Sequence, residues 1–335
     1  MSVTTKIQWC DSTCNPTMGC DGCELWNPAA GVRTCYAGVL HSRFGGSTKG
    51  YSPTFDQLTQ WPGRTAEAAG WPDLAGKPRP GKPWLDGLPR IIFVSDMSDA
   101  LSAAVPFDFL EAEVVAATAS PAGRRHRWLW LTKRPERMAR FSADLLRRGI
   151  PWPDNLWAGT SVTSQATAAR VNSLLRVGDG RTTRFLSVEP QRGPLDLSAH
   201  LPHLDWVIQG GESGRGATAF HVEWALDLLA QCQTAGVAYF LKQLGANVLR
   251  GGDQLRLADG HGGDWAEWPE AVRVRQMPEA GGPAEPVAGP QTGSSDRLPL
   301  AVVDTGKGRR AALKAWVTRR ENERRRNEGD AARTV

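Results

Sequence analysis

Five of the six cysteines of this 335-residue chain lie within twenty-six residues of one another, from Cys10 to Cys35. Thiolates gathered on one loop either form disulfides or bind a soft metal centre. No apolar signal segment opens the sequence, so we expect a cytoplasmic protein. In a reducing cytoplasm, clustered cysteines favour metal binding or catalysis over disulfides.

The spacing of these cysteines fits two kinds of metal site. A structural zinc ion needs four ligands, which Cys10, Cys14, Cys20 and Cys23 could supply. An iron–sulfur cluster held by three cysteines would instead leave one iron open for a substrate or cofactor. Buried, unreactive thiols are a third alternative, and spacing alone does not decide among them.

The elements that must position these thiols follow a regular alternation of strand and helix. Short, wholly apolar strands that alternate with helices indicate a parallel sheet covered on both faces. The sequence therefore predicts an α/β fold with a partial or closed parallel barrel of six to seven units, with a doubly wound sheet as the alternative. The predicted strands are 6–9, 90–96, 128–131, 156–160, 185–188, 206–208 and 238–241, and the predicted helices are 36–44, 107–117, 135–148, 164–175 and 222–234.

Charged side chains follow the predicted strands at their carboxyl ends, where parallel α/β proteins build their sites. Each could be a solvated loop residue or half of a structural ion pair. As a set, converging charges could hold a zwitterionic or anionic ligand. These residues are Lys133, Arg134, Glu189, Glu212 and Lys242.

The remaining segments lack this alternation. Residues 45–89 are rich in Gly, Pro and Trp and are predicted to form an irregular insertion within a barrel of residues 1–250. Residues 251–278 form a C-terminal extension. Residues 279–335 read as a flexible linker followed by a basic tail, with a short helix around 311–320. The tail is either a solvated end or a contact for nucleic-acid backbones.

Composition sets wider bounds on function. The formal net charge is +5, a mild excess that permits a polyanionic partner without requiring one. No apolar run approaches transmembrane length, so we expect no membrane partner.

Several motifs together resemble one family, the three-cysteine-motif phage proteins, which are regarded as relatives of radical S-adenosylmethionine (SAM) enzymes. The resemblance covers most of residues 5–275. The motifs that carry it are Ile7–Thr13, Asn15-Pro16, Gly19-Cys20, Cys35-Tyr36-Ala37, Leu131–Arg137, Ser187–Pro190, Gly210–Gly214, Leu241–Gln243 and the segment from Gly262 to Pro269.

The resemblance implies that Cys20, Cys23 and Cys35 hold a [4Fe–4S] cluster, with the aromatic Tyr36 directly after the last ligand. Radical SAM enzymes usually place three and two residues between these cysteines, whereas this chain has two and eleven. The insertion Glu24–Thr34 causes the departure and makes Cys14 a possible substitute for the middle ligand.

The same resemblance implies a radical SAM-like enzyme acting on a substrate that could be nucleic acid or its precursor. SAM would chelate the open iron, and Ser95 and Asp96, at the end of the second strand, would contact it. A reductant would supply one electron. The alternative is a non-enzymatic, zinc-stapled nucleic-acid-binding protein.

Overall fold

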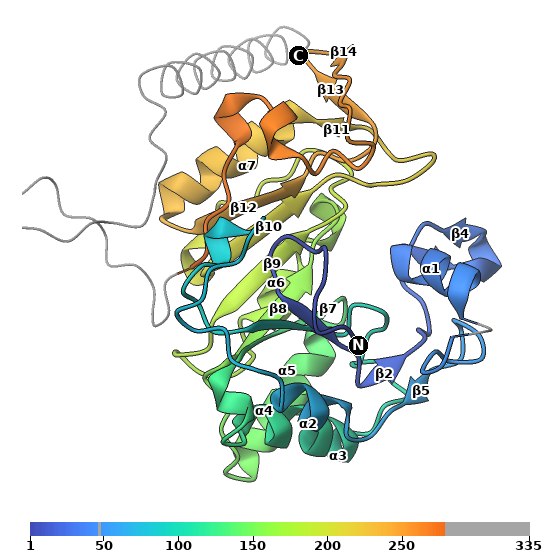
Figure 1. Cartoon of the computed structure of the whole chain (residues 1–335), viewed down its shortest axis with the longest axis vertical. Helices are drawn as coiled ribbons and strands as arrows, with labels where there is room; N and C mark the ends of the chain where they lie inside the picture. The colour runs from blue at the N-terminus through green and yellow to red at the C-terminus, as the bar shows by residue number, and fades with distance from the viewer. Residues whose placement is uncertain (46–47, 279–335) are drawn as a thin grey trace, which may run out of the picture.

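Seven strands form one parallel sheet that organises the chain (Figure 1). The computed structural model describes residues 1–45 and 48–278. Strand order follows the sequence, so each strand–helix unit is added beside the preceding one, and the sheet curves into an open half-barrel. The predicted partial parallel barrel is confirmed. From edge to edge the strands are β1 (Ser12–Cys14), β6 (Ile91–Val94), β7 (Arg127–Thr132), β8 (Leu156–Ser161), β9 (Arg184–Val188), β10 (Trp206–Gly210) and β12 (Ala238–Gln243).

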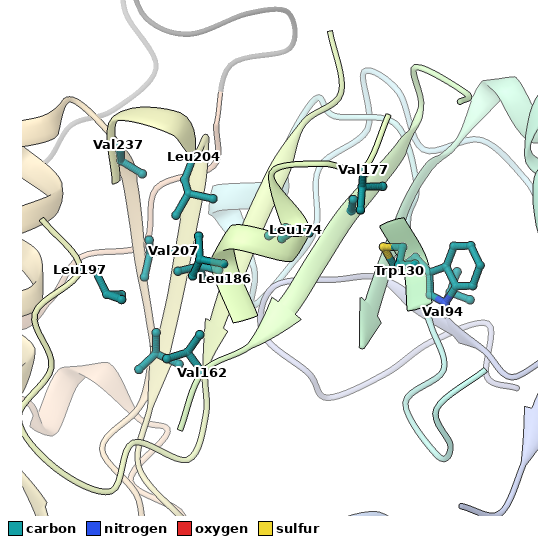
Figure 2. Close-up of a cluster of buried hydrophobic side chains, with 14 of the residues drawn as sticks. Val94, Trp130, Val162, Leu174, Val177, Leu186, Leu197, Leu204, Val207 and Val237 are labelled. Atoms are coloured by element: carbon teal, nitrogen blue, oxygen red, sulfur yellow. The ribbon is translucent and has the colours of Figure 1, made fainter. Parts of the chain in front are cut away.

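Alternate residues of these strands face two different cores, because side chains in a strand point to opposite faces. One face carries Val94, Trp130 and Val207 and is covered by helices. Figure 2 shows part of this layer, in which Leu174 from a covering helix lies among the strand side chains. The long apolar runs of the sequence thus reflect burial on both faces.

Helices cover one side of the sheet and mostly follow the predicted positions. The long ones are α5 (Pro135–Arg147) and α7 (Val222–Ala235). Residues 107–119 form α3 (Phe107–Leu110), one π-helical segment and α4 (Ala116–Ala119). The predicted helix 164–175 is instead a 3-10 turn followed by α6 (Arg170–Leu174), because Ser164 and Thr167 cap that first turn. No described helix is long and apolar enough to span a membrane.

The opposite, concave face is filled by aromatic rings and covered by irregular segments rather than helices. Trp9 packs on Phe93 with ring centroids 4.6 Å apart, and Trp206 contacts Trp9, Trp157 and Phe240. This layer fills the concave face from the amino ends to the middle of the strands.

The predicted first strand, residues 6–9, is wrong. The Lys82 ammonium donates to the backbone carbonyls of Thr5, Ile7 and Cys10 at 2.7–2.8 Å. Because these carbonyls bond to a side chain, the segment forms a turn, and the first sheet strand starts at Ser12. The predicted irregular insertion 45–89 also contains a short helix, α2 (Arg64–Ala69), that packs against α4.

The C-terminal extension packs back onto the edge strand β12. Gln276 donates its backbone N–H to the carbonyl of Tyr239 at 2.9 Å, and Leu241 donates to Val274 at 2.8 Å. The Arg275 guanidinium lies over the ring of Trp84, 4.3 Å from its centroid. The extension therefore belongs to the same packed unit as the barrel. The predicted linker and basic tail, residues 279–335, lie outside the described residues.

Before α7 and after β12, short strands form a separate three-stranded sheet. It contains β11 (Phe220–His221), β13 (Val248–Arg250) and β14 (Asp253–Gln254). Two antiparallel pairs lie near the cysteines, β2 (Thr17–Met18) with β5 (Thr59–Gln60), and β3 (Trp26–Asn27) with β4 (Val32–Arg33).

Candidate functional site

The carboxyl edge of the concave face carries several of the predicted site residues. A step of two residues from a side chain on this face reaches the next one on the same face. Ser187 and Phe240 therefore lead to Glu189 and Lys242, and Ser95 directly follows β6 at the same edge. The Lys242 ammonium lies 2.9 Å from a carboxylate oxygen of Glu189, which brings together the ends of β9 and β12. We call this edge the mouth of the half-barrel.

Ser95 ends β6 in an unusual conformation. Among the described residues, Ser95 is the one non-glycine residue with a positive φ, which is 72°. Such a backbone conformation stores strain. Its side chain is buried, and its Oγ has no hydrogen-bond partner among the described residues. A buried hydroxyl without a partner is costly unless a ligand completes it. Ser95 is therefore the strongest local indication of a ligand at the mouth.

Asp96 follows this turn and is turned toward β1. Its carboxylate accepts a hydrogen bond from the side-chain amide of Asn15. Burial raises the pKa of Asp96, although the Asn15 hydrogen bond opposes the change.

Tyr36 connects residues 20–35, which we call the cysteine segment, to the end of β6. It is the first residue of α1 (Tyr36–Phe44), directly after Cys35. Its ring is half exposed, and its hydroxyl donates to the backbone carbonyl of Asp96. Burial of the hydroxyl and the nearby Asp96 charge raise the pKa of Tyr36, so the phenol stays neutral and acts as a donor. Cys35 is thereby fixed beside the mouth.

Cys20, Cys23 and Cys35 are the three partly exposed thiols of the chain, and all are free. The Cys23 thiol lies within electrostatic range of both of the others. Burial raises the pKa of Cys20 to about 12 and raises that of Cys23, so both thiols are protonated without a metal. A metal centre would bind their thiolates and release the protons.

Cys10 and Cys14 lie elsewhere and are fully buried. Cys10 belongs to the aromatic layer of the concave face, whereas Cys14 packs on the helix side with its sulfur 3.7 Å from Thr65 Oγ1. The structure therefore does not bring Cys14 close to Cys20 and Cys35, where it would have to lie to replace Cys23 as the middle ligand. It also separates the four cysteines of the zinc alternative. Within residues 1–45 and 48–278, no three Cys, His, Asp or Glu side chains are grouped to hold one metal ion.

An ion pair ties the first part of the cysteine segment to β7. Asp21, between Cys20 and Cys23, accepts two hydrogen bonds from the Arg134 guanidinium, one of them at 2.8 Å. Ser102 adds a third at 2.7 Å. Burial alone would raise the pKa of Asp21, but Arg134 and Ser102 lower it below its usual value. The Asp21 carboxylate is therefore charged and held.

A second ion pair ties the insertion between Cys23 and Cys35 to the next unit. Both carboxylate oxygens of Glu24 lie 2.8 Å from the Arg170 guanidinium. Burial would raise the pKa of Glu24, but the hydrogen bonds and charge of Arg170 hold it at about 2. Arg192, after β9, donates to Thr34 at 3.0 Å. Three arginines that follow three successive strands thus hold the segment.

Packing inside the insertion supports these ion pairs. The Trp26 ring lies against Gly38 of α1, so closely that a Cβ on Gly38 would be 2.3 Å from the ring. Trp26 Nε1 donates to Asp56 at 2.7 Å, and Phe55 meets the same ring edge-on. In Figure 1 this lobe, with α1 and β4, stands at one side of the sheet.

A comparison with protein families identifies the group to which the chain belongs. One family model matches residues 4–323, nearly the whole chain. The chain belongs to the DUF5131 family. That family is described as a protein of unknown function. Neither the curated proteins nor the solved structures contain a match to this chain.

In this DUF5131 protein, the structure gives the predicted charged residues different surroundings. Glu189 and Lys242 pair at the mouth, and Ser95 and Asp96 follow β6 at the same edge of the sheet. Arg134 holds the cysteine segment instead. Glu212 lies to one side, where its carboxylate accepts from Arg192 at 3.4 Å and from the backbone of Thr218 at 3.0 Å.

Lys133 lies beside the cysteines. Its charge lowers the pKa of Cys23, although burial outweighs this effect. No carboxylate of the described chain lies within ion-pair distance of its ammonium.

Sequence reasoning missed Asp21, Glu24 and Arg170 in this DUF5131 protein. A signal was present, because two carboxylates lie within the cysteine segment and arginines follow the strands. Only the fold shows which arginine meets which carboxylate.

Proposed function

We propose that this protein is a radical SAM-like iron–sulfur enzyme of the three-cysteine-motif type. Cys20, Cys23 and Cys35 would hold a [4Fe–4S] cluster, and SAM would bind at the mouth of the half-barrel. The observation that supports this most is the segment bearing three free, partly exposed thiols, held by arginines at the carboxyl edge of a parallel sheet.

The donor set fits a cluster better than a single ion. A cubane cluster binds each cysteine through a different iron, so its thiolates stand apart, unlike ligands that converge on one zinc. Three thiols leave one iron for another ligand. The partnerless Ser95 Oγ offers that ligand a hydrogen bond at the mouth.

When bound, such a cluster supplies one electron that breaks a carbon–sulfur bond of SAM and starts radical chemistry. The chain's own residues would bind and shield. Ser95 would donate to SAM, and the Glu189–Lys242 pair, 2.9 Å apart, offers one acceptor and one donor group for its zwitterionic amino acid end. Tyr36, neutral and fixed on Asp96, keeps Cys35 beside them. A protein or small-molecule reductant would be the electron donor.

Metal analysis tests the proposal directly. Protein purified without oxygen should be brown and contain iron and sulfide at about four each per chain. Cys20→Ala, Cys23→Ala and Cys35→Ala should each lose the cluster. Cys232→Ala, a matched change of a thiol buried on α7, should keep it. Stoichiometric zinc without iron would instead support the zinc-stapled alternative.

Turnover needs a separate measurement. Chemically reduced protein should release 5′-deoxyadenosine from SAM, and Ser95→Ala should weaken SAM binding while its iron content stays unchanged. An unchanged affinity of Ser95→Ala for SAM would show that Ser95 does not contact SAM.

Contact with nucleic acid through the basic residues 307–326 remains part of the proposal. Deletion of residues 297–335 should weaken DNA or RNA binding and flatten its dependence on salt, by a little under one unit of slope per lost phosphate contact. Iron content should not change. An unchanged affinity for nucleic acid would show that residues 297–335 do not contribute to its binding.

A further inference from the structure

A pocket of about 500 Å³ lies where α5 and α6 begin. Leu101 and Ala103 form part of its wall, and Ser173 adds a hydroxyl. Its remaining lining is strongly basic, with Glu136 as the acidic residue among the described lining residues. The basic residues are Lys133, Arg134, Arg137, Arg140 and Arg170.

Two of these five cations are neutralised by the cysteine segment. Arg134 pairs with Asp21, and Arg170 pairs with Glu24. The others, Lys133, Arg137 and Arg140, have no carboxylate of the described chain within 4.0 Å. With Glu136 counted, the pocket keeps a net charge of about two positive, and such a concave basic surface concentrates anions.

Arg137 is the most informative of the three. Its Nη2 donates to the carbonyl of Val105, and its guanidinium lies 4.7 Å from the ring centroid of Phe107, so the side chain is fixed. Burial, and then the cations Arg140 and Arg134, lower the pKa of Arg137. An anion in the pocket would relieve this repulsion between cations.

We infer that this pocket binds a phosphate group of a phosphorylated ligand. Phosphate has several oxygens that accept hydrogen bonds at once, and arginine matches it through paired donors. The first turn of the thirteen-residue α5 adds a positive helix dipole at the same place. The volume admits more than a phosphate ion, which suits a mononucleotide or the terminal phosphate of a nucleic acid.

This site does not depend on a metal centre, since its cations come from helices α5 and α6 and the end of β7. Binding can therefore be measured on full-length protein with or without iron. The probe is inorganic pyrophosphate, titrated calorimetrically in a buffer without other phosphate, with sodium acetate and sodium chloride at matched ionic strength as comparison anions.

The wild-type chain should bind pyrophosphate saturably and acetate far more weakly. Arg140→Gln changes an exposed side chain and should weaken pyrophosphate binding roughly tenfold. Arg147→Gln, on the same helix but paired with Asp144, is the matched control and should bind as the wild type does. Equal binding of acetate and pyrophosphate, or equal weakening by both variants, would overturn the assignment.

Competition identifies the source of the phosphate. Displacement of pyrophosphate by AMP indicates a small nucleotide. Displacement only by a 5′-phosphorylated oligonucleotide, and not by the same strand without its phosphate, indicates a nucleic-acid end. Failure of both to displace pyrophosphate would overturn the phosphate-ester assignment.

Discussion

Arg134 joins the end of β7 to Asp21 through two parallel hydrogen bonds from its guanidinium. It therefore connects the parallel sheet to the short stretch between Cys20 and Cys23. The same guanidinium donates to the carbonyl of Gly22 at 3.0 Å and lies 3.9 Å from Asp99. A residue expected at the ligand site is thus a positioning residue for the cysteines.

Asp21→Asn should loosen the cysteine segment without unfolding the barrel. The lost charge leaves Arg134 with weaker hydrogen bonds, and because the pair is partly exposed we expect the free energy of unfolding to fall by about 1 kcal/mol. Hydrogen exchange of residues 20–35 should accelerate. Asp144→Asn, at the exposed ion pair of α5, is the control. Unchanged exchange in Asp21→Asn would show that other contacts hold the segment.

The Glu24–Arg170 pair should make the stability of the docked insertion depend on pH. The pKa of Glu24 falls from its ordinary value of 4.5 in the unfolded chain to about 2 in the folded chain. A lowered carboxyl pKa stabilises the fold above pH 4.5, and this stabilisation is lost as the pH falls through that range toward 2. We expect the stability difference between wild type and Glu24→Gln to be full at pH 6 and to shrink below pH 4.5. A difference that stays constant from pH 6 to pH 3 would contradict the pairing.

Gly38→Ala tests the contact between α1 and Trp26. In an exposed helix this change would stabilise by about 1 kcal/mol. Here the new Cβ would lie 2.3 Å from the Trp26 ring, and overpacking of this kind costs about 1–3 kcal/mol. We therefore expect a lower unfolding temperature. Gly180→Ala, which has no atom within 4 Å of its new Cβ, should change it little. A stabilised Gly38→Ala would mean that the lobe moves apart easily.

Thiol labelling should separate the six cysteines into two groups. In native, metal-free protein, iodoacetamide should modify Cys20, Cys23 and Cys35 first, because they are partly exposed. Cys10, Cys14 and Cys232 are fully buried and should react only after unfolding. Mass spectrometry of peptides from a labelling time course measures this order. Early modification of Cys14 would place it near the surface and restore it as a candidate ligand.

Much of the fold was predictable because each sheet strand after residue 90 is an apolar run bounded by polar residues. The runs around Ile92, Leu129 and Phe240 have this form, and burial on both faces explains it. Residues 6–9 have a similar pattern, yet the carbonyls of Ile7 and of the flanking Thr5 and Cys10 bond to Lys82, more than seventy residues away. No local pattern contains that partner.

The sequence predicted which types of residue form the candidate site better than it predicted which of them contact one another. Cysteines and strand-end charges are visible in the sequence, and the alternation of side chains along β9 and β12 explains why Glu189 and Lys242 meet at the mouth. The strain at Ser95 and the pairing of Glu24 with Arg170 depend on long-range geometry. The basic pocket likewise forms only when the starts of α5 and α6 lie together.

The arginines that hold the cysteine segment come much later in the chain than the cysteines. Arg134 follows Asp21 by 113 residues, Arg170 follows Glu24 by 146, and Arg192 follows Thr34 by 158. At a synthesis rate of about 5–20 residues per second, the cysteines leave the ribosome roughly 6 to 30 seconds before the arginines that hold them. A nascent chain therefore presents cysteines without these ion pairs for that interval. Under the proposed function, a cluster inserted during this time would meet an undocked segment, whereas one inserted after release would meet a docked segment.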